Sequence, residues 1–139
     1  MTVQEVKSKL GNVYVEYRGY LLAEEKTEQL KDMLALPAPG AGSDVPKSEH
    51  GDNVTENKYI AAMWYSEEVG RRFRKYVLTR QEAEAMINGL KYFDEREVLT
   101  RHYIMFQKWE EIADKMYVSL RKVHYLHSKG LVNIAESDR

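Results

Sequence analysis

One segment near the C-terminal end of the chain combines cationic, aromatic and hydroxyl side chains in a pattern suited to nucleic-acid binding. Residues 119–134 contain no acidic side chain. Their basic residues are Arg121, Lys122 and Lys129. Arginine and lysine bind phosphate oxygens and can read guanine edges in the major groove of DNA. The chemistry expected of this segment is therefore recognition of double-stranded DNA.

The spacing of side chains in this segment predicts an amphipathic helix. At about 100° per residue, the residues divide into two opposite faces. The apolar face contains Val123, Leu126, His127, Gly130 and Ile134. The opposite face contains Arg121, Tyr125, Ser128 and Val132, with Lys122 and Lys129 on one shoulder and His124 on the other. We expect the apolar face to pack on neighbouring helices, with His127 as a partly buried structural residue.

The polar face gives specific expectations for DNA contacts. We expect Arg121 and Tyr125 to reach base edges, and Lys122 and Lys129 to bind phosphates, with Ser128 nearby. Ser119 would act at the start of the helix, where backbone N–H groups attract anions. A solvated surface face is the alternative interpretation, because basic amphipathic helices are common at protein surfaces.

The residues before this helix predict two further short helices. Val98, Leu99, His102 and Tyr103 indicate the first, and Trp109, Ile112, Ala113 and Met116 indicate the second. Residues 105–108 connect these two helices. Tyr117 and Val118 then form a tight turn, and Ser119 is a favourable N-cap. Short helices joined by a turn of three or four residues are typical of a helix-turn-helix.

These residues also resemble a known family. The matching stretches are Glu95–Leu99, Arg101–Ile104, Trp109–Ala113, Tyr117–Ser119 and Val123. They resemble the promoter-reading C-terminal domain of bacterial sigma factors. Together with the closing stretch Leu126–Leu131, they look closer still to small sigma-like transcriptional regulators of phages and prophages in Gram-positive bacteria. The resemblance covers residues 93–135 and is only architectural elsewhere.

The resemblance implies control of transcription from phage or prophage promoters. By matching position, it assigns Leu120, Arg121, His124 and Tyr125 to the face that enters the DNA groove. Two positions depart from the family pattern. Gly130 replaces the usual alanine and should weaken the helix by about 1 kcal/mol. The pair Tyr117–Val118 is shifted by one residue from the usual Tyr-Ser pair.

The first half of the chain predicts a helical arm, residues 1–35, followed by a flexible linker, residues 36–53. The linker holds all three prolines and the glycines Gly40, Gly42 and Gly51, which disfavour a regular helix. The arm has an apolar stripe at helical spacing. Its members are Leu10, Val13, Tyr17, Tyr20, Thr27, Leu30 and Leu34. The arm either packs on its own domain or acts as a coiled coil with a second helix or subunit.

Residues 54–92 predict connecting helices. Asn53 with Glu56 resembles a capping box, and Thr79 with Glu82 resembles a second one that would open another helix. The expected apolar stripe of the first helix is Ile60, Met63, Trp64, Phe73 and Val77. The helix after Thr79 would bury Ala83, Met86, Ile87 and Leu90. The predicted fold class is therefore all-α: helical arm, linker, connecting helices and a sigma-like helix-turn-helix at 93–135.

Composition narrows the classes of function. The 139 residues include no cysteine, which excludes disulfides and favours a reducing, cytoplasmic location. No stretch is long and apolar enough to span a membrane. We expect no enzyme, no cofactor and no metal site. The histidines lack metal-ligand spacing, and adjacent Glu110 and Glu111 would diverge by about 100° on a helix. The cluster Arg71–Lys75 could bind phosphate or be a solvated face.

Three functions remain open. The first is a sequence-specific DNA-binding regulator of transcription, acting as a homodimer through the N-terminal helix. The second is a protein-interaction module that contacts RNA polymerase or another regulator. The third is a DNA-packaging or scaffolding component that oligomerises through the arm. The acid-free basic face favours the first.

Overall fold

The described part of the chain is entirely helical, which confirms the predicted all-α class. A computed structural model describes residues 1–34 and 52–138, with side chains from residue 56 in the second range. Its helices are α1 (Val3–Leu34), α2 (Asp52–Asn88), α3 (Phe93–Leu99), the π-helical turn η1 (Thr100–Ile104), α4 (Trp109–Met116) and α5 (Leu120–Ser137). No strand occurs in these residues. The predicted linker lies outside the described residues, except that its last two positions begin α2.

The chain divides into two compact units. Unit 1 contains Met1–Arg18 and Lys75–Arg139, and unit 2 contains Gly19–Arg74. Helices α1 and α2 each contribute one segment to unit 1 and another segment to unit 2.

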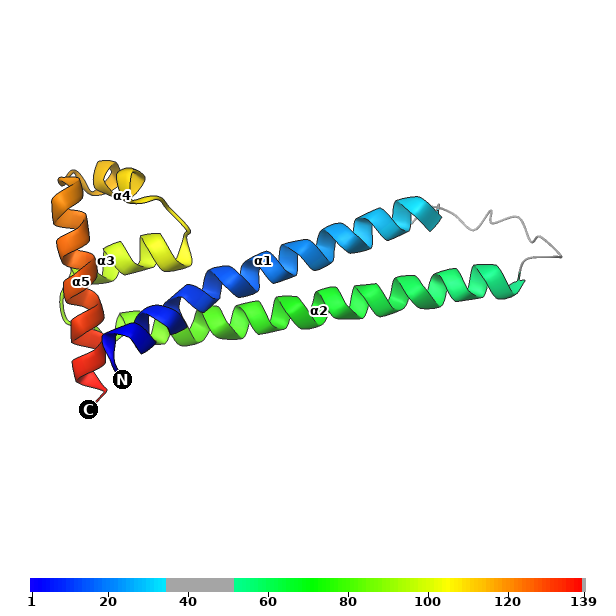
Figure 1. Cartoon of the computed structure of the whole chain (residues 1–139), viewed down its shortest axis with the longest axis horizontal. Helices are drawn as coiled ribbons and strands as arrows, with labels where there is room; N and C mark the ends of the chain where they lie inside the picture. The colour runs from blue at the N-terminus through cyan, green and yellow to red at the C-terminus, as the bar shows by residue number, and fades with distance from the viewer. Residues whose placement is uncertain (35–51, 139) are drawn as a thin grey trace. The chain divides into compact units, whose positions relative to one another are not determined.

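Unit 1 is held together by two clusters of buried apolar side chains. The larger cluster joins α1, α2, α3, η1 and α5, with Leu10, Ile87 and Leu99 among its fully buried members. The smaller cluster joins α3, α4 and α5 through Val98, Ile112 and Val123. Figure 1 shows α5, orange to red, lying across α3 with α4 at its N-terminal end. Three short helices therefore bury their apolar faces against one another.

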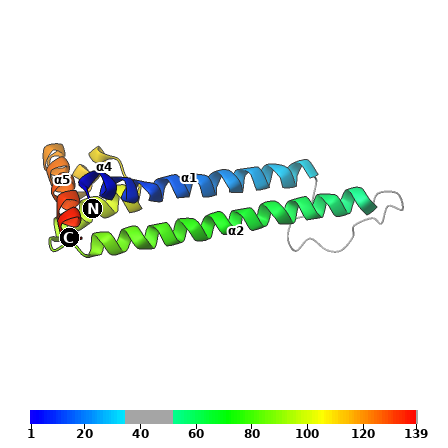
Figure 2. The same cartoon turned by 60° about the horizontal axis from the view of Figure 1, so that its bottom comes forward.

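The two ends of the described chain meet in unit 1. The N-terminal ammonium of Met1 lies 3.3 Å from Oδ2 of Asp138, just after α5. Figure 2 shows the start of α1 beside the end of α5. The first turns of α1 therefore belong to the same packed unit as the C-terminal helices, and Val6, Leu10 and Val13 are fully buried there.

Helix α2 corrects the expectation of two connecting helices. It runs without interruption through Thr79, which was predicted to cap a new helix. The Thr79 hydroxyl instead donates a hydrogen bond to the carbonyl of Lys75, 2.8 Å away and one turn earlier. Because this bond satisfies the hydroxyl inside a continuous helix, threonine does not interrupt the chain here.

Unit 2 pairs the second half of α1 with the first half of α2. The buried residues of this pair are small: Ala23, Thr27 and Ala62. The Thr27 hydroxyl lies 2.9 Å from the carbonyl oxygen of Ala23 and 3.4 Å from that of Tyr65 on the other helix. Lys26 and Glu68 form an ion pair of 3.8 Å across the same helices. Thr27 of the stripe predicted on α1 therefore contacts the chain's own α2, and Leu10 and Val13 of the same stripe lie in the core of unit 1.

The apolar stripe predicted for the first part of α2 is not a buried face. Met63 is 62% exposed and Trp64 is 70% exposed, and Ile60 and Phe73 are also exposed. The Phe73 ring nevertheless contacts the Tyr20 ring of α1, with centres 5.2 Å apart, and Val77 packs against the core of unit 1. The periodicity correctly indicated a helix but misidentified its buried side, because small residues line the contact with α1.

Candidate nucleic-acid interface

The turn between α4 and α5 is fixed by backbone geometry and one side-chain cap. Tyr117 adopts a left-handed conformation at φ 56° and ψ 42°, which ends α4. The N–H of Val118 donates to the carbonyl of Ala113 over 3.1 Å, closing the end of the helix. Ser119 begins α5, since its Oγ accepts a hydrogen bond from the Lys122 N–H at 3.1 Å. The predicted turn and the predicted N-cap are both confirmed.

The buried face of α5 contains every residue predicted for it. Val123, Leu126, His127, Gly130 and Ile134 are buried. Packing explains why position 130 is a glycine, because a Cβ atom added there would lie 2.9 Å from Cδ1 of Leu99 on α3. The glycine that lowers the intrinsic stability of the helix therefore permits close approach of α5 to α3.

A polar contact secures the same pair of helices. The side-chain amide of Asn133 donates to both carboxylate oxygens of Glu95, at 3.0 and 2.9 Å. Glu95 is buried, so this amide replaces part of the hydration that its carboxylate has lost. The sequence does not predict this pair, because the two residues are 38 positions apart in the chain.

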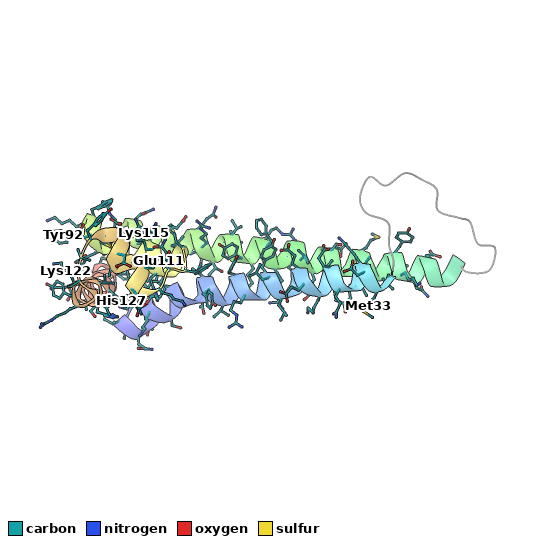
Figure 3. All side chains as sticks on the ribbon, turned by 90° about the horizontal axis from the view of Figure 1, so that it is seen from above. Met33, Tyr92, Glu111, Lys115, Lys122 and His127 are labelled. Atoms are coloured by element: carbon teal, nitrogen blue, oxygen red, sulfur yellow. The ribbon has the colours of Figure 1, made fainter. Side chains whose placement is uncertain are left out.

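The residues predicted to face DNA are all exposed. They are Ser119, Leu120, Arg121, Lys122, His124, Tyr125, Ser128 and Lys129. All belong to α5 or its N-cap, so one rigid helix presents them together. The Lys122 ammonium lies 5.2 Å from the centre of the Tyr125 ring, a cation–π distance. Figure 3 labels Lys122 and His127, which belong to the exposed and the buried faces of α5 respectively.

A cluster of aromatic rings packs against His127 on the buried face of α5. The Tyr103 hydroxyl and Nε2 of His127 are 2.7 Å apart. Burial, reinforced by the charges of His102, Lys7 and His124, lowers the pKa of His127 to about 4. Burial also raises the pKa of Tyr103 to about 12. At neutral pH the imidazole is therefore uncharged, and its burial beside the Tyr103 hydroxyl confirms the expected structural role of His127.

Trp109 links this cluster to the exposed face. His102 stacks on the Trp109 ring with centres 3.7 Å apart and planes 15° apart. Nδ1 of His102 donates to the carbonyl of Gln107 over 3.1 Å. Burial lowers the pKa of His102 despite this hydrogen bond, which acts in the opposite direction. The other side of the link is His124, whose ring centre lies 5.1 Å from that of Trp109.

Acidic residues occupy the neighbouring helix. Glu110, Glu111 and Asp114 are exposed on α4. Figure 3 labels Glu111 and Lys115 on this helix. Carboxylates repel phosphate oxygens, so α4, which also carries the exposed Lys115, is less favourable for phosphate than the acid-free part of α5.

The cationic cluster Arg71–Lys75 is partly engaged in ion pairs. Arg72 lies 4.0 Å from Glu68 in unit 2, and Lys75 lies 3.4 Å from Glu16 in unit 1. These pairs favour the interpretation of a solvated helix face. Within residues 1–34 and 52–138, no group of three potential metal-ligating side chains occurs. No helix described here is long and apolar enough to cross a membrane.

Comparison with known proteins gave no match, whether to family models, to curated protein sequences or to solved structures.

Proposed function

We propose that α4, the turn at Tyr117–Ser119 and α5 form a helix-turn-helix that binds double-stranded DNA. The observation that carries the proposal is the division of α5 into two faces. One face is buried on α3, η1 and α4, while the other exposes Arg121, Lys122 and Lys129 with no acid between Ser119 and Ile134. A recognition helix needs this division, because it must dock on its domain while entering the major groove.

The exposed residues divide into two roles. Arg121 and Tyr125 lie at the centre of the face and would reach base edges, where arginine recognises guanine. Lys122 and Lys129 flank them and would bind phosphates. Ser119 and Leu120 would meet the backbone at the start of the helix, and His124 and Ser128 would line the sides of the groove. The cation–π contact between Lys122 and Tyr125 would order both side chains before DNA arrives.

The resemblance to small sigma-like regulators supports a role in controlling phage or prophage transcription. On this proposal RNA polymerase is a further partner. The chain would act as a homodimer, each subunit reading one half of a two-fold-related site. Leu10, Val13 and Thr27 of the predicted stripe are buried within the chain. The apolar candidates for a dimer contact are therefore exposed side chains: Leu22 and Met33 on α1, with Met63 and Trp64 on α2.

The same exposed side chains favour the second candidate function, a protein-interaction module. A contiguous patch of exposed apolar residues commonly marks a protein–protein contact, and Met63 and Trp64 line the same surface pocket of unit 2. In that case unit 2 would bind RNA polymerase or another regulator, or would oligomerise as part of a packaging or scaffolding assembly.

Fluorescence anisotropy with a labelled random-sequence duplex tests DNA binding directly. We expect the wild-type protein to bind at low salt and its affinity to fall steeply at physiological salt. Arg121→Ala should lower affinity at least tenfold, because it removes a cation from the centre of the face. Lys122→Ala should weaken binding less and reduce the salt slope by about 1.

Arg71→Ala is the matched control, since Arg71 is an exposed arginine on a helix of unit 2. Its affinity for the duplex should equal that of the wild type. Absence of binding at low salt, or an equal loss in Arg71→Ala and Arg121→Ala, would exclude α5 as the DNA-binding helix and favour the interaction module.

A further inference from the structure

Unit 1 contains a cavity that the DNA-binding proposal does not use. It has a volume of about 540 Å³ and opens between α1 and the segment that joins η1 to α4. Its walls include Gly11, Tyr14, His102, Tyr103, Phe106 and Trp109. Sites for small molecules typically measure about 300–1,000 Å³ and are mostly apolar with a few polar groups. Both the size and the composition of this cavity fit that description.

The walls present aromatic faces from separate parts of the chain. The Tyr14 ring of α1 meets the Phe106 ring at 5.2 Å, with planes 64° apart. On another wall, Trp109 and His102 form a stacked pair. Offset stacking and edge-to-face contact are the preferred arrangements between aromatic rings. A planar ring entering here could meet both kinds of surface.

Gly11 enlarges this cavity. A Cβ atom added at Gly11 would have no neighbouring atom within 4 Å, so no packing contact requires a glycine there. Glycine inside a helix is destabilising relative to alanine. The contrast with Gly130, where a Cβ would approach Leu99 to 2.9 Å, shows that the two helical glycines have different roles. The absence of a side chain at Gly11 therefore leaves open space at the wall of the cavity.

Phe106 adopts an unusual backbone conformation at the same cavity. Its φ is 59°, which is uncommon for a bulky residue other than glycine. This conformation sets the Phe106 ring against Tyr14 and against Tyr17, at 5.2 and 5.0 Å. The conformation ends η1 as that of Tyr117 ends α4, and the N–H of Gln107 donates to the carbonyl of Arg101 over 2.9 Å. The cavity therefore combines a missing side chain on one wall with an aromatic ring that the end of η1 positions on another.

From these observations we infer that the cavity binds a small, neutral, planar aromatic molecule. The ring faces supply stacking surfaces, and the lining includes Gln107, whose Oε1 accepts a hydrogen bond from Arg101 at 3.3 Å. Lys108 and Glu110 carry opposite charges at the lining, so the site has no net preference for an ion of either sign. The ligand would contact Trp109, which in turn lies against His124 on α5.

Isothermal titration calorimetry with 2-naphthol and decahydro-2-naphthol tests the inference on the full chain. The two compounds share one carbon skeleton, but only the first is planar and aromatic. We expect saturable binding of 2-naphthol at one site per chain, and at least tenfold weaker binding of the saturated compound. Gly11→Leu should weaken 2-naphthol binding at least tenfold by filling the cavity.

Gly19→Leu is the matched control, because Gly19 is another glycine inside α1 but lies in unit 2. It should bind 2-naphthol like the wild type. If Gly11→Leu fails to fold, as judged by circular dichroism, Tyr14→Ala replaces it, since Tyr14 is an exposed part of the wall. Tyr14→Ala should lower affinity at least threefold.

Three results would overturn the inference. They are absence of saturable binding to the wild type, equal affinity for the planar and the saturated compound, and unchanged binding in both Gly11→Leu and Tyr14→Ala. The first of these would also leave an aromatic side chain of a protein partner as the better occupant. None of these measurements involves DNA, so the inference and the proposed function can fail independently.

Discussion

The two units of this chain use their apolar residues in opposite ways. Unit 1 buries large side chains such as Leu10, Ile87, Leu99 and Ile112 completely. In unit 2 the buried residues are Ala23, Thr27 and Ala62, while large residues such as Trp64 are exposed. The difference shows that a helix period alone does not identify the buried face.

The number of packed helices explains this contrast. In unit 1 several helices surround common clusters, so that large side chains are enclosed from several directions. In unit 2 two helices form a single contact, and small residues along that contact let the backbones come close. Large side chains beside the contact, such as Trp64, remain largely exposed to solvent.

The largest expected difference between the units comes from truncating one large side chain in each. Ile87→Ala in unit 1 should lower the free energy of unfolding by about 2–5 kcal/mol, because it leaves a cavity in a closed core. Trp64→Ala in unit 2 should change it by less than about 0.5 kcal/mol, because Trp64 is mainly solvated. Urea denaturation followed by circular dichroism measures both. Equal losses would show that Trp64 is covered in solution.

Acid should lower the free energy of unfolding through protonation of His127, which is buried in unit 1. Its pKa of about 4 in the folded chain lies below the ordinary 6.5, so between these values only the unfolded chain binds the proton. The free energy of unfolding should therefore fall as pH decreases from 6.5 to 4, by up to about 3 kcal/mol from this group. Urea denaturation across that range should show a smaller decrease for His127→Leu. An identical decrease in the variant would mean that His127 titrates normally in the folded state.

The sequence predicted the region around α5 well because its determinants are local. Ser119 caps the helix that it precedes, and the helical wheel placed His127 on the buried face from neighbouring residues alone. The prediction for α2 was wrong at Thr79, whose hydroxyl bonds to Lys75 inside a continuous helix. It was also wrong around Trp64, where the buried side depends on which residues α1 presents. The cavity was not predicted, because Gly11 and Trp109 come together only through the fold. DNA binding itself stays a prediction.

Enlarging a small residue in the unit 2 contact should be unfavourable although it adds apolar surface. Ala62→Leu should lower the free energy of unfolding by about 1–3 kcal/mol, because the added atoms must separate α1 from α2. Ala61→Leu is a control on the adjacent, less buried position and should cost less. Urea denaturation compares the two. A neutral Ala62→Leu would contradict close approach as the basis of this helix pair.

The smallest expected effect comes from replacing one glycine by alanine in each unit. The two substitutions should change the free energy of unfolding in opposite directions. Gly19→Ala should raise the free energy of unfolding by up to about 1 kcal/mol, since alanine favours the helix. Its new Cβ would meet only the end of the Arg72 side chain, at 3.7 Å. Gly130→Ala gains the same helix propensity but forces buried Leu99 to move, so we expect a net loss of about 1 kcal/mol. Thermal denaturation of the two variants under one condition measures the difference. Stabilisation by Gly130→Ala would mean that α3 and α5 are separated more widely in solution, because the tight contact between them is the sole reason for expecting the two substitutions to differ in sign.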